Sequence, residues 1–169
     1  MKSEMKIRAA AESDLPQLTE IYNHYISQTA ITFDLDPFTV EQRREWLAHY
    51  HLTGRHRCLV AELGGNVLGY ATSSRARAKD AYLTSVETSI YCRPEATGQR
   101  IGTTLYEALF KSLRGEDLHR AYAGITMPND TSRRFHERFG FRALATYSEM
   151  GRKFDKYWDV LFLEKKLDI

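Results

Sequence analysis

Two kinds of hydrophobic pattern alternate along this chain. Short apolar runs bounded by turn residues predict strands, whereas apolar residues repeated at intervals of three and four predict amphipathic helices. The strand pattern occurs over residues 7–9, 57–63, 67–74, 81–92, 121–126, 141–149 and 156–165.

Four helices are predicted between these strands. Ser13 or Asp14 can cap the first helix, and Pro16 falls in its first turn, where a missing N–H is harmless. Thr39 can cap the second, with Gln42 three residues later as its capping-box partner. The other two helices are expected over residues 103–113 and 130–139.

The order of these elements indicates the fold class. Strands outnumber helices, and antiparallel hairpins mix with one strand–helix–strand crossover. This pattern predicts an α/β fold with a mixed, mostly antiparallel central sheet and helices on both faces. No repeat, low-complexity tract or proline-rich linker interrupts the chain, so residues 1–169 are expected to form a single domain.

Composition and charge narrow the class of protein. Hydrophobic residues make up 43% of the chain, enough for a core, and the formal net charge is only +2, which argues against a nucleic-acid partner. The sequence has no apolar run of membrane-spanning length and no signal-peptide pattern at its start, so we expect no membrane partner and a cytoplasmic location. Cys58 and Cys92 are expected to be buried, reduced thiols.

The segment 89–106 contains the clearest candidate binding site. An apolar strand leads into a turn with Gly98 and Gly102, and the turn opens a helix. The free N–H groups at such a helix start bind pyrophosphate, although the same spacing also fits an ordinary strand–helix turn. Further donors and a cation come from Thr103, Thr104 and Arg100.

This turn resembles the acyl-CoA pyrophosphate loop of the GNAT acetyltransferase superfamily, whose usual pattern is Gln/Arg-x-x-Gly-x-Gly/Ala. Here Thr97 replaces the usual Gln or Arg, and Arg100 replaces the first glycine. Both departures leave the backbone cradle in place. The resemblance implies a GNAT fold and acetyl-CoA as co-substrate, bound by Gly98, Gln99, Arg100, Ile101, Gly102, Thr103 and Thr104.

A second segment, residues 127–141, resembles the Asn-x-x-Ser/Ala…Gly-Phe block of the same superfamily. The resemblance implies that Asn129 binds the pantetheine arm and that Ser132 lies near the thioester. A capped helix with a glycine stop explains the same residues without a ligand. The backbone of the strand before the loop is expected to hold the acetyl carbonyl and the pantetheine amides, through Ile90, Tyr91 and Cys92.

The resemblance extends over almost the whole chain. The strings Ile-Tyr-Asn-His-Tyr at 21–25, Ala-Tyr at 81–82 and Glu-Thr-Ser-Ile-Tyr at 87–91 are similar to the phosphinothricin acetyltransferase-like branch. That branch includes enzymes that acetylate methionine sulfone, methionine sulfoximine and related amino acids. The resemblance therefore implies acetyl transfer to the amine of a small amino acid or analogue, and a homodimer.

Acetylation of an amine requires a base that takes a proton from the ammonium group. Glu87 is the candidate, because it lies on the strand that leads into the loop and burial would raise its pKa. The alternative is a strand glutamate that faces solvent. His136 lies seven residues after Asn129, where it can protonate the leaving thiolate or simply pack on its helix.

Substrate contacts are expected from two groups of residues. One of the basic residues between the third and fourth strands can pair with a substrate carboxylate, and Arg77 is preferred over Arg75; a solvated basic loop is the alternative. An aromatic wall, or else ordinary core, is expected from Tyr25, Phe33 and Tyr82. Thr88, next to Glu87, is also placed in the substrate site.

Two other functions also fit the sequence. The acceptor can instead be a protein N-terminus or lysine, or the chain can be a non-catalytic acyl-CoA-binding module. The presence of Glu87 argues against the second of these. No His, Cys, Asp and Glu residues have metal-ligand spacing, so no metal is expected.

Overall fold

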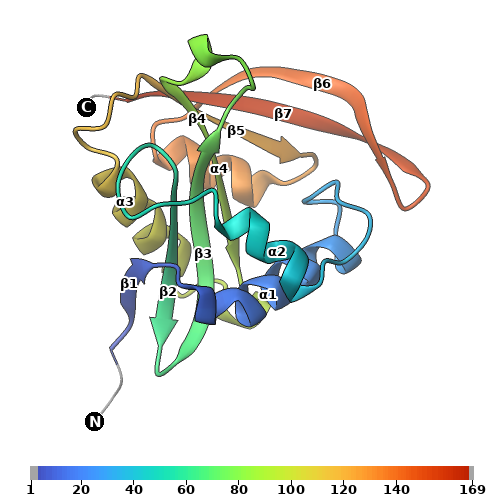
Figure 1. Cartoon of the computed structure of the whole chain (residues 1–169). Helices are drawn as coiled ribbons and strands as arrows, with labels where there is room; N and C mark the ends of the chain where they lie inside the picture. The colour runs from blue at the N-terminus through green and yellow to red at the C-terminus, as the bar shows by residue number, and fades with distance from the viewer. Residues whose placement is uncertain (1–3, 168–169) are drawn as a thin grey trace.

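A computed structural model describes residues 4–167 and contains one seven-stranded sheet in the order β1-β2-β3-β4-β5-β7-β6 (Figure 1). Neighbouring strands are antiparallel except β4 and β5, which are parallel. The predicted fold class is therefore confirmed. The strands are β1 (Lys6–Ala9), β2 (Arg57–Leu63), β3 (Asn66–Arg75), β4 (Ser85–Cys92), β5 (Arg120–Thr126), β6 (Arg142–Lys153) and β7 (Lys156–Lys166).

Helices cover both faces of the sheet, as predicted (Figure 1). In α2, Thr39 and Gln42 form the expected capping box. The α-helices are α1 (Leu15–Gln28), α2 (Val40–Leu47), α3 (Ile101–Ser112) and α4 (Asp130–Arg138). Short 3₁₀ helices are η1 (Glu12–Asp14), η2 (Asp80–Tyr82) and η3 (Pro94–Ala96).

Three predicted boundaries were wrong by two residues or more, each for a local reason. The strand expected at 81 begins at Ser85, because the Leu83 amide bonds to the Asp80 carbonyl and closes η2 instead. The helix expected at 103 begins at Ile101, directly after Arg100 turns the chain with φ of 61°. The sixth strand continues to Lys153, past a register shift between Tyr147 and Gly151.

The cysteine prediction held for one residue of the two. Both are free thiols, but only Cys58 is buried, while Cys92 is half-buried near the end of β4. Gly69 on β3 packs closely against this end of β4. A Cβ atom at Gly69 would lie only 2.9 Å from Cys92 Sγ and from the Tyr91 carbonyl oxygen, so a side chain does not fit there.

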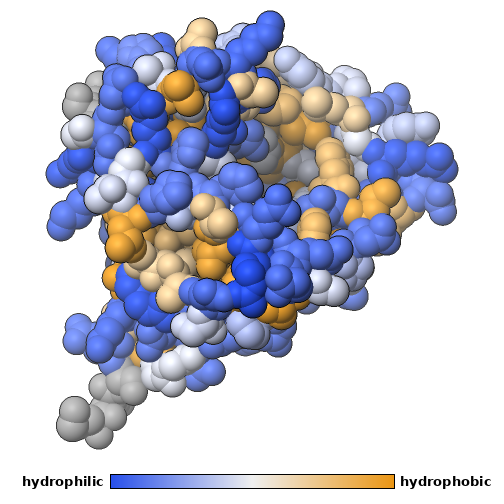
Figure 2. All heavy atoms as spheres, viewed as in Figure 1, coloured by the Kyte–Doolittle hydropathy of each residue, from blue (hydrophilic) through white to orange (hydrophobic). Residues whose placement is uncertain are grey.

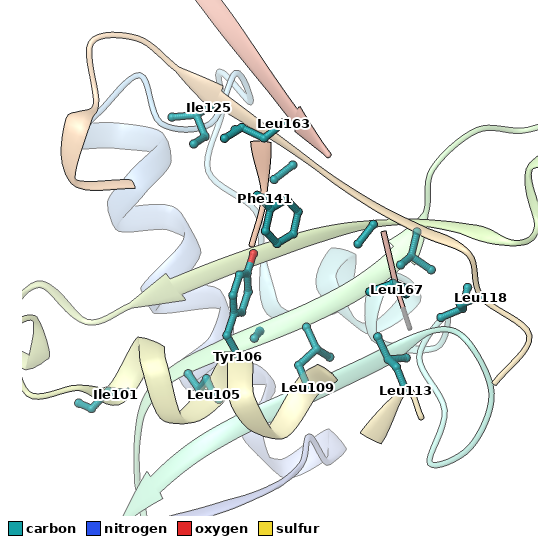
Figure 3. Packing of buried hydrophobic residues seen from close by; sticks show 14 of the residues in the cluster. Ile101, Leu105, Tyr106, Leu109, Leu113, Leu118, Ile125, Phe141, Leu163 and Leu167 are labelled. Carbon is teal, nitrogen blue, oxygen red and sulfur yellow. The ribbon is translucent and has the colours of Figure 1, made fainter. Parts of the chain in front are cut away.

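The alternation of side chains along the central strands builds two cores. Val60 and Tyr70 face α1 and α2, whereas Ala61 and Ala71 face α3. Successive strand residues point to opposite faces, so one strand serves both cores. The larger core rests on one side of α3, from which the labelled side chains project toward the sheet (Figure 3): Ile101, Leu105, Tyr106, Leu109 and Leu113.

The sheet opens between its two parallel strands. β4 pairs with β5 only over three positions, Ser85–Arg120, Val86–Ala121 and Glu87–Tyr122. On its other side β4 remains paired with β3 as far as Cys92. Within residues 4–167, the edge of β4 that faces β5 therefore has no strand partner beyond Glu87, in the middle of the sheet.

We predict that Leu109→Ala lowers the free energy of unfolding by about 2–5 kcal/mol, because Leu109 is fully buried and its removal leaves a cavity. Denaturant unfolding measures the change. Leu52→Ala is the control: Leu52 is 75% exposed, and its truncation should change stability by less than about 0.5 kcal/mol. Equal effects of the two substitutions would contradict this assignment of the core.

Candidate active site

A narrow cleft lies where β4 and β5 separate. Its walls are residues 88–91 of β4 and residues 123–126 of β5, and its volume is about 60 Å³. The start of α4 closes one end through Asn129, Ser132 and His136. The structure thus brings together most residues that the sequence assigned to the pantetheine arm and thioester; Cys92 lies outside the lining.

The turn before α3 presents a row of free backbone donors. In residues 4–167, no carbonyl or side chain accepts a hydrogen bond from the amides of residues 98–103. Gly98 has φ of 80° and Arg100 has φ of 61°, and the turn is exposed. Such a set of amides at a helix start, together with the helix dipole, is suited to a phosphate group.

The side chains of this turn contribute less than expected. The hydroxyl of Thr97 donates to the Pro94 carbonyl and that of Thr104 to the Arg100 carbonyl, at 2.8 and 3.1 Å. Gly102 faces inward, where a Cβ atom would lie 3.4 Å from Ile90 Cδ1. The arrangement indicates that backbone amides, more than these hydroxyls, form the anion site.

Glu87 lies on the opposite face of β4 from Thr88 and borders a separate cavity of about 240 Å³. In the described part of the chain, its carboxylate has no hydrogen-bond or ion-pair partner. Burial raises the pKa of Glu87, and the charge of Arg77 opposes that shift. Figure 2 shows a hollow in the face of the molecule drawn there, with apolar residues at its border. A half-buried, unpaired carboxylate in a cavity can accept a proton from a substrate.

His136 is part of a buried chain of polar groups. Its Nδ1 lies 2.8 Å from the Ser132 carbonyl oxygen and its Nε2 lies 3.0 Å from the Tyr106 hydroxyl, which is 3.1 Å from Thr88 Oγ1. A carbonyl only accepts, so neutral His136 donates through Nδ1 and accepts at Nε2. This leaves no free N–H for a leaving thiolate, and the geometry favours the packing interpretation of His136.

The two candidate arginines have different surroundings. Arg75 is held by its own turn: it pairs with Asp80 at 2.9 Å and donates to the carbonyls of Arg77 and Ala78. Arg77 is exposed and borders the cavity that contains Glu87. Of the two, only Arg77 is positioned to meet a substrate beside Glu87.

The expected aromatic wall does not assemble. Tyr82 borders the Glu87 cavity, but Phe33 lies against Gly151 of β6, and the Tyr25 hydroxyl donates to the Cys92 carbonyl at 2.5 Å. Thr88 faces α3 and is buried, so it does not join the cavity of Glu87. Phe33 lies in the connection between α1 and α2, which carries no periodic signal in the sequence.

Sequence reasoning missed two buried polar residues near the site. Tyr106, which bonds to His136, is spaced with Leu109 and Leu113 on the inner side of α3. Arg43 is 4% exposed on α2, three residues before Trp46 and four before Leu47. An arginine on the apolar side of a helix was the available signal.

Residues 4–167 contain no helix long and apolar enough to cross a membrane. Nor do they contain a group of three or more His, Cys, Asp and Glu side chains arranged to hold a metal ion.

Comparison with known proteins places this geometry in context. Residues 18–141 match the Acetyltransferase (GNAT) family. A phosphinothricin N-acetyltransferase from Streptomyces coelicolor is 53% identical, with 98% of each chain covered. An L-methionine sulfoximine/L-methionine sulfone acetyltransferase from Salmonella typhimurium is 34% identical over 97% of this chain and 95% of the relative. An acetyltransferase structure from Salmonella typhimurium with its cofactor acetyl-CoA has a TM-score of 0.93 and 34% identity, covering 99% of this chain and 96% of the other.

We predict that His136 makes the protein less stable as the pH falls from 7 to 5. Burial lowers the pKa of His136 below its unfolded value, so below about pH 6.5 the unfolded chain binds a proton that the folded chain does not. The contribution to the free energy of unfolding should be lost at up to about 1.4 kcal/mol per pH unit.

Chemical denaturation at several pH values, for the unaltered protein and His136→Gln, measures this loss. The variant should show a flatter pH dependence between 7 and 5. His24→Gln, at an exposed position on α1, is the control and should keep the original slope. The same slope in His136→Gln as in the unaltered protein would contradict the prediction.

Proposed function

Because this chain belongs to the GNAT acetyltransferase family, we propose that it transfers acetyl from acetyl-CoA to the amine of a small amino acid or analogue. The observation that carries the proposal is the unpaired Glu87 carboxylate in a cavity beside the open edge of β4. The names of the relatives support acceptors such as phosphinothricin, methionine sulfone and methionine sulfoximine.

Acetyl-CoA is proposed to bind along the cleft between β4 and β5. The free amides of residues 98–103 would hold the pyrophosphate, with Arg100 adding positive charge. The pantetheine arm would pair with the open edge of β4 at residues 90–92, as an added strand does. Asn129 and Ser132 line the far end of this cleft, where the thioester would lie.

The proposed reaction is direct attack on the thioester. Glu87 removes a proton from the ammonium group of the acceptor, and the neutral amine attacks the acetyl carbonyl. The new C–N bond forms, the C–S bond breaks, and CoA leaves as a thiolate, which takes up the second proton that the nitrogen releases as the amide forms. A thiol pKa of about 8.5 makes this thiolate a stable leaving group near neutral pH, so a dedicated acid is not required. The role of His136 as that acid stays a prediction.

Glu87 and the acceptor would be held together by the cavity wall. Arg77 is proposed to bind the carboxylate of the amino acid, because it borders the same cavity and a guanidinium suits a carboxylate. Tyr82 and Phe162 form apolar parts of the wall. A cavity of about 240 Å³ suits a free amino acid better than a peptide.

One assay distinguishes the proposed function from the two alternatives, a protein or peptide acetyltransferase and a non-catalytic acyl-CoA-binding module. Release of CoA thiol is followed with acetyl-CoA and a panel of free amino acids, peptides and proteins. Thiol release with free amino acids supports the proposal. Release only with peptides or proteins would show that the acceptor is a peptide or protein amine instead. Tight binding of acetyl-CoA without thiol release for any acceptor would leave the non-catalytic module.

The site of action and the assembly are part of the same proposal. We place the enzyme in the cytoplasm and propose a homodimer formed through the hairpin of β6 and β7. β6 is the edge strand of the sheet, and this hairpin exposes five large apolar side chains. They are Leu144, Tyr147, Met150, Phe154 and Tyr157.

We predict that Glu87→Gln lowers kcat by about 10²- to 10⁴-fold, the range typical of lost general base catalysis. The pKa of Glu87 is raised by burial, so the unaltered enzyme should lose kcat/KM on the acid side as Glu87 becomes protonated, and the variant should lack that limb. Steady-state kinetics across pH and equilibrium binding of acetyl-CoA measure both effects. Binding of acetyl-CoA should be unchanged.

Glu107→Gln is the matched control, because Glu107 is exposed on α3 and should leave kcat and the pH profile as they are. A Glu87→Gln enzyme with the original turnover and pH profile would remove Glu87 from the role of base.

We predict that Met150→Asp separates the dimer. A charge buried in an apolar interface without a partner is unfavourable, and Met150 is 56% exposed within one chain. Sedimentation velocity should give twice the chain mass for the unaltered protein and for the control Leu52→Asp, and a single chain mass for Met150→Asp. A monomeric unaltered protein would refute the assembly.

A further inference from the structure

A second cavity, of about 250 Å³, lies between α1, α2 and the sheet. Arg43 of α2 borders it and is 4% exposed. The guanidinium carbon lies over the rings of Tyr22 and Trp46, 4.5 and 3.5 Å from their centroids. Aromatic rings contact the faces of a guanidinium and leave the N–H groups at its edge free for other partners.

The N–H groups of Arg43 are almost unpartnered. Nη2 reaches the Tyr70 hydroxyl at 3.3 Å, and buried Nε has no hydrogen-bond partner in the described residues. Among residues 4–167 no carboxylate comes within 4.0 Å of this guanidinium. The next residue, Arg44, lies on the exposed side of α2 and does form ion pairs, with Glu12 and Glu41. A buried charge without a counter-ion is unfavourable, which indicates that an anion completes the site.

Asp34 also borders the cavity but does not supply that anion. Its carboxylate accepts a hydrogen bond from the Tyr22 hydroxyl. Buried Lys153, whose Nζ donates to the Thr32 carbonyl at 2.8 Å, lies near enough for the charge of Asp34 to raise its pKa against the effect of burial. The negative charge of Asp34 thus also acts on Lys153 and is not available to Arg43 alone.

The cavity of Arg43 leads toward Glu87 along the face of β3 and β4. In the register of these strands Thr72 is opposite Ser89, and Ser74 is opposite Glu87. The Arg43 cavity is lined by Thr72, Ser74 and Ser89, and Ser89 also lines the cofactor cleft. The Cα atoms of Ser89 and Glu87 are about 7 Å apart at strand spacing, the length of a small extended amino acid.

We propose that Arg43 is a specificity-determining residue, which binds an oxyanion on the side chain of the acceptor while the amine of that acceptor lies at Glu87. The inference rests on the proposed function and deepens it. The chemical class is an amino acid with a side-chain phosphinate or carboxylate. Arg77 would hold the α-carboxylate, and Arg43 the distal group.

The physical basis is the cost of leaving Arg43 unpaired. An acceptor with a distal oxyanion gives the buried Nε–H an acceptor, and a planar guanidinium can bind two oxygens at once. An acceptor without that group fills the same space and leaves the N–H groups unsatisfied. Sites that bind a polar group in this way discriminate strongly against analogues that lack it.

The test compares Arg43→Met with Arg44→Met, the same change one residue later on the exposed side of α2. The acceptors are phosphinothricin, which carries a distal phosphinate, and methionine, which carries an uncharged thioether. Arg43→Met should lower kcat/KM for phosphinothricin at least tenfold and change that for methionine by less than threefold. Arg44→Met should leave the ratio of the two unchanged.

Arg43→Lys keeps the charge but loses the planar fork. It should lower the preference for phosphinothricin by less than Arg43→Met does, with the value for methionine again retained. A purely structural role would instead lower kcat/KM for both acceptors in parallel, and that outcome would overturn the proposal.

Binding to unaltered Arg43 is followed separately through the fluorescence of Trp46, which lies over its guanidinium. Trp158→Phe leaves Trp46 as the sole tryptophan, since the chain has two. With CoA bound, phosphinothricin should change the emission in a saturable way and methionine should not. Equal responses, or none to phosphinothricin while the enzyme acetylates it, would overturn the proposal.

Failure of the proposed function has a different signature, in which no free amino acid releases thiol from acetyl-CoA. Failure of this inference leaves acetylation intact and shows the same acceptor preference in Arg43→Met and Arg44→Met.

Discussion

The parting of β4 from β5 is the constraint on which the rest of this structure depends. Inside a sheet, each strand normally satisfies the backbone groups of its neighbours. Here the parallel pair ends at Glu87, and the next residues of β4 present an open edge in the centre of the molecule. That edge and the polar start of α4 border one cleft, and the chain continues from β4 into the turn whose amides are free, so a single departure from regular pairing underlies the proposed cofactor site.

β4 also separates the two halves of the chemistry. Successive residues point to opposite faces. Thr88 therefore faces the core of α3, while Glu87 borders the cavity on the other side. Ser89 lines both the cofactor cleft and the Arg43 cavity, which makes it the point where donor and acceptor would meet. The amine would thus reach the thioester from across the strand.

The sequence predicted the regular elements well, because strands and helices repeat with fixed periods. The capping box at Thr39 and Gln42 and the seven strands followed from such patterns. Errors arose where the regular pattern of apolar residues is interrupted. Tyr82 is of a residue type common in strands but lies in η2, and the register shift after Tyr147 interrupts the strand pattern before the end of β6.

The site was predicted unevenly for the same reason. Glu87 and His136 lie on regular elements, and each borders one of the two cavities of the site. Phe33 lies on the connection after α1, and its packing against Gly151 depends on a strand more than a hundred residues later. Arg43 was missed because charged residues are expected on exposed faces.

The left-handed backbone conformation of Arg100 has a consequence for ligand exchange. A left-handed conformation costs an L-residue roughly 1–2 kcal/mol, and this cost is met once, when the domain folds around η3 and α3. The conformation of the loop is thus supplied by the fold of the domain. At the proposed pyrophosphate site, a ligand would then not have to order the backbone, and little conformational entropy would be lost on binding.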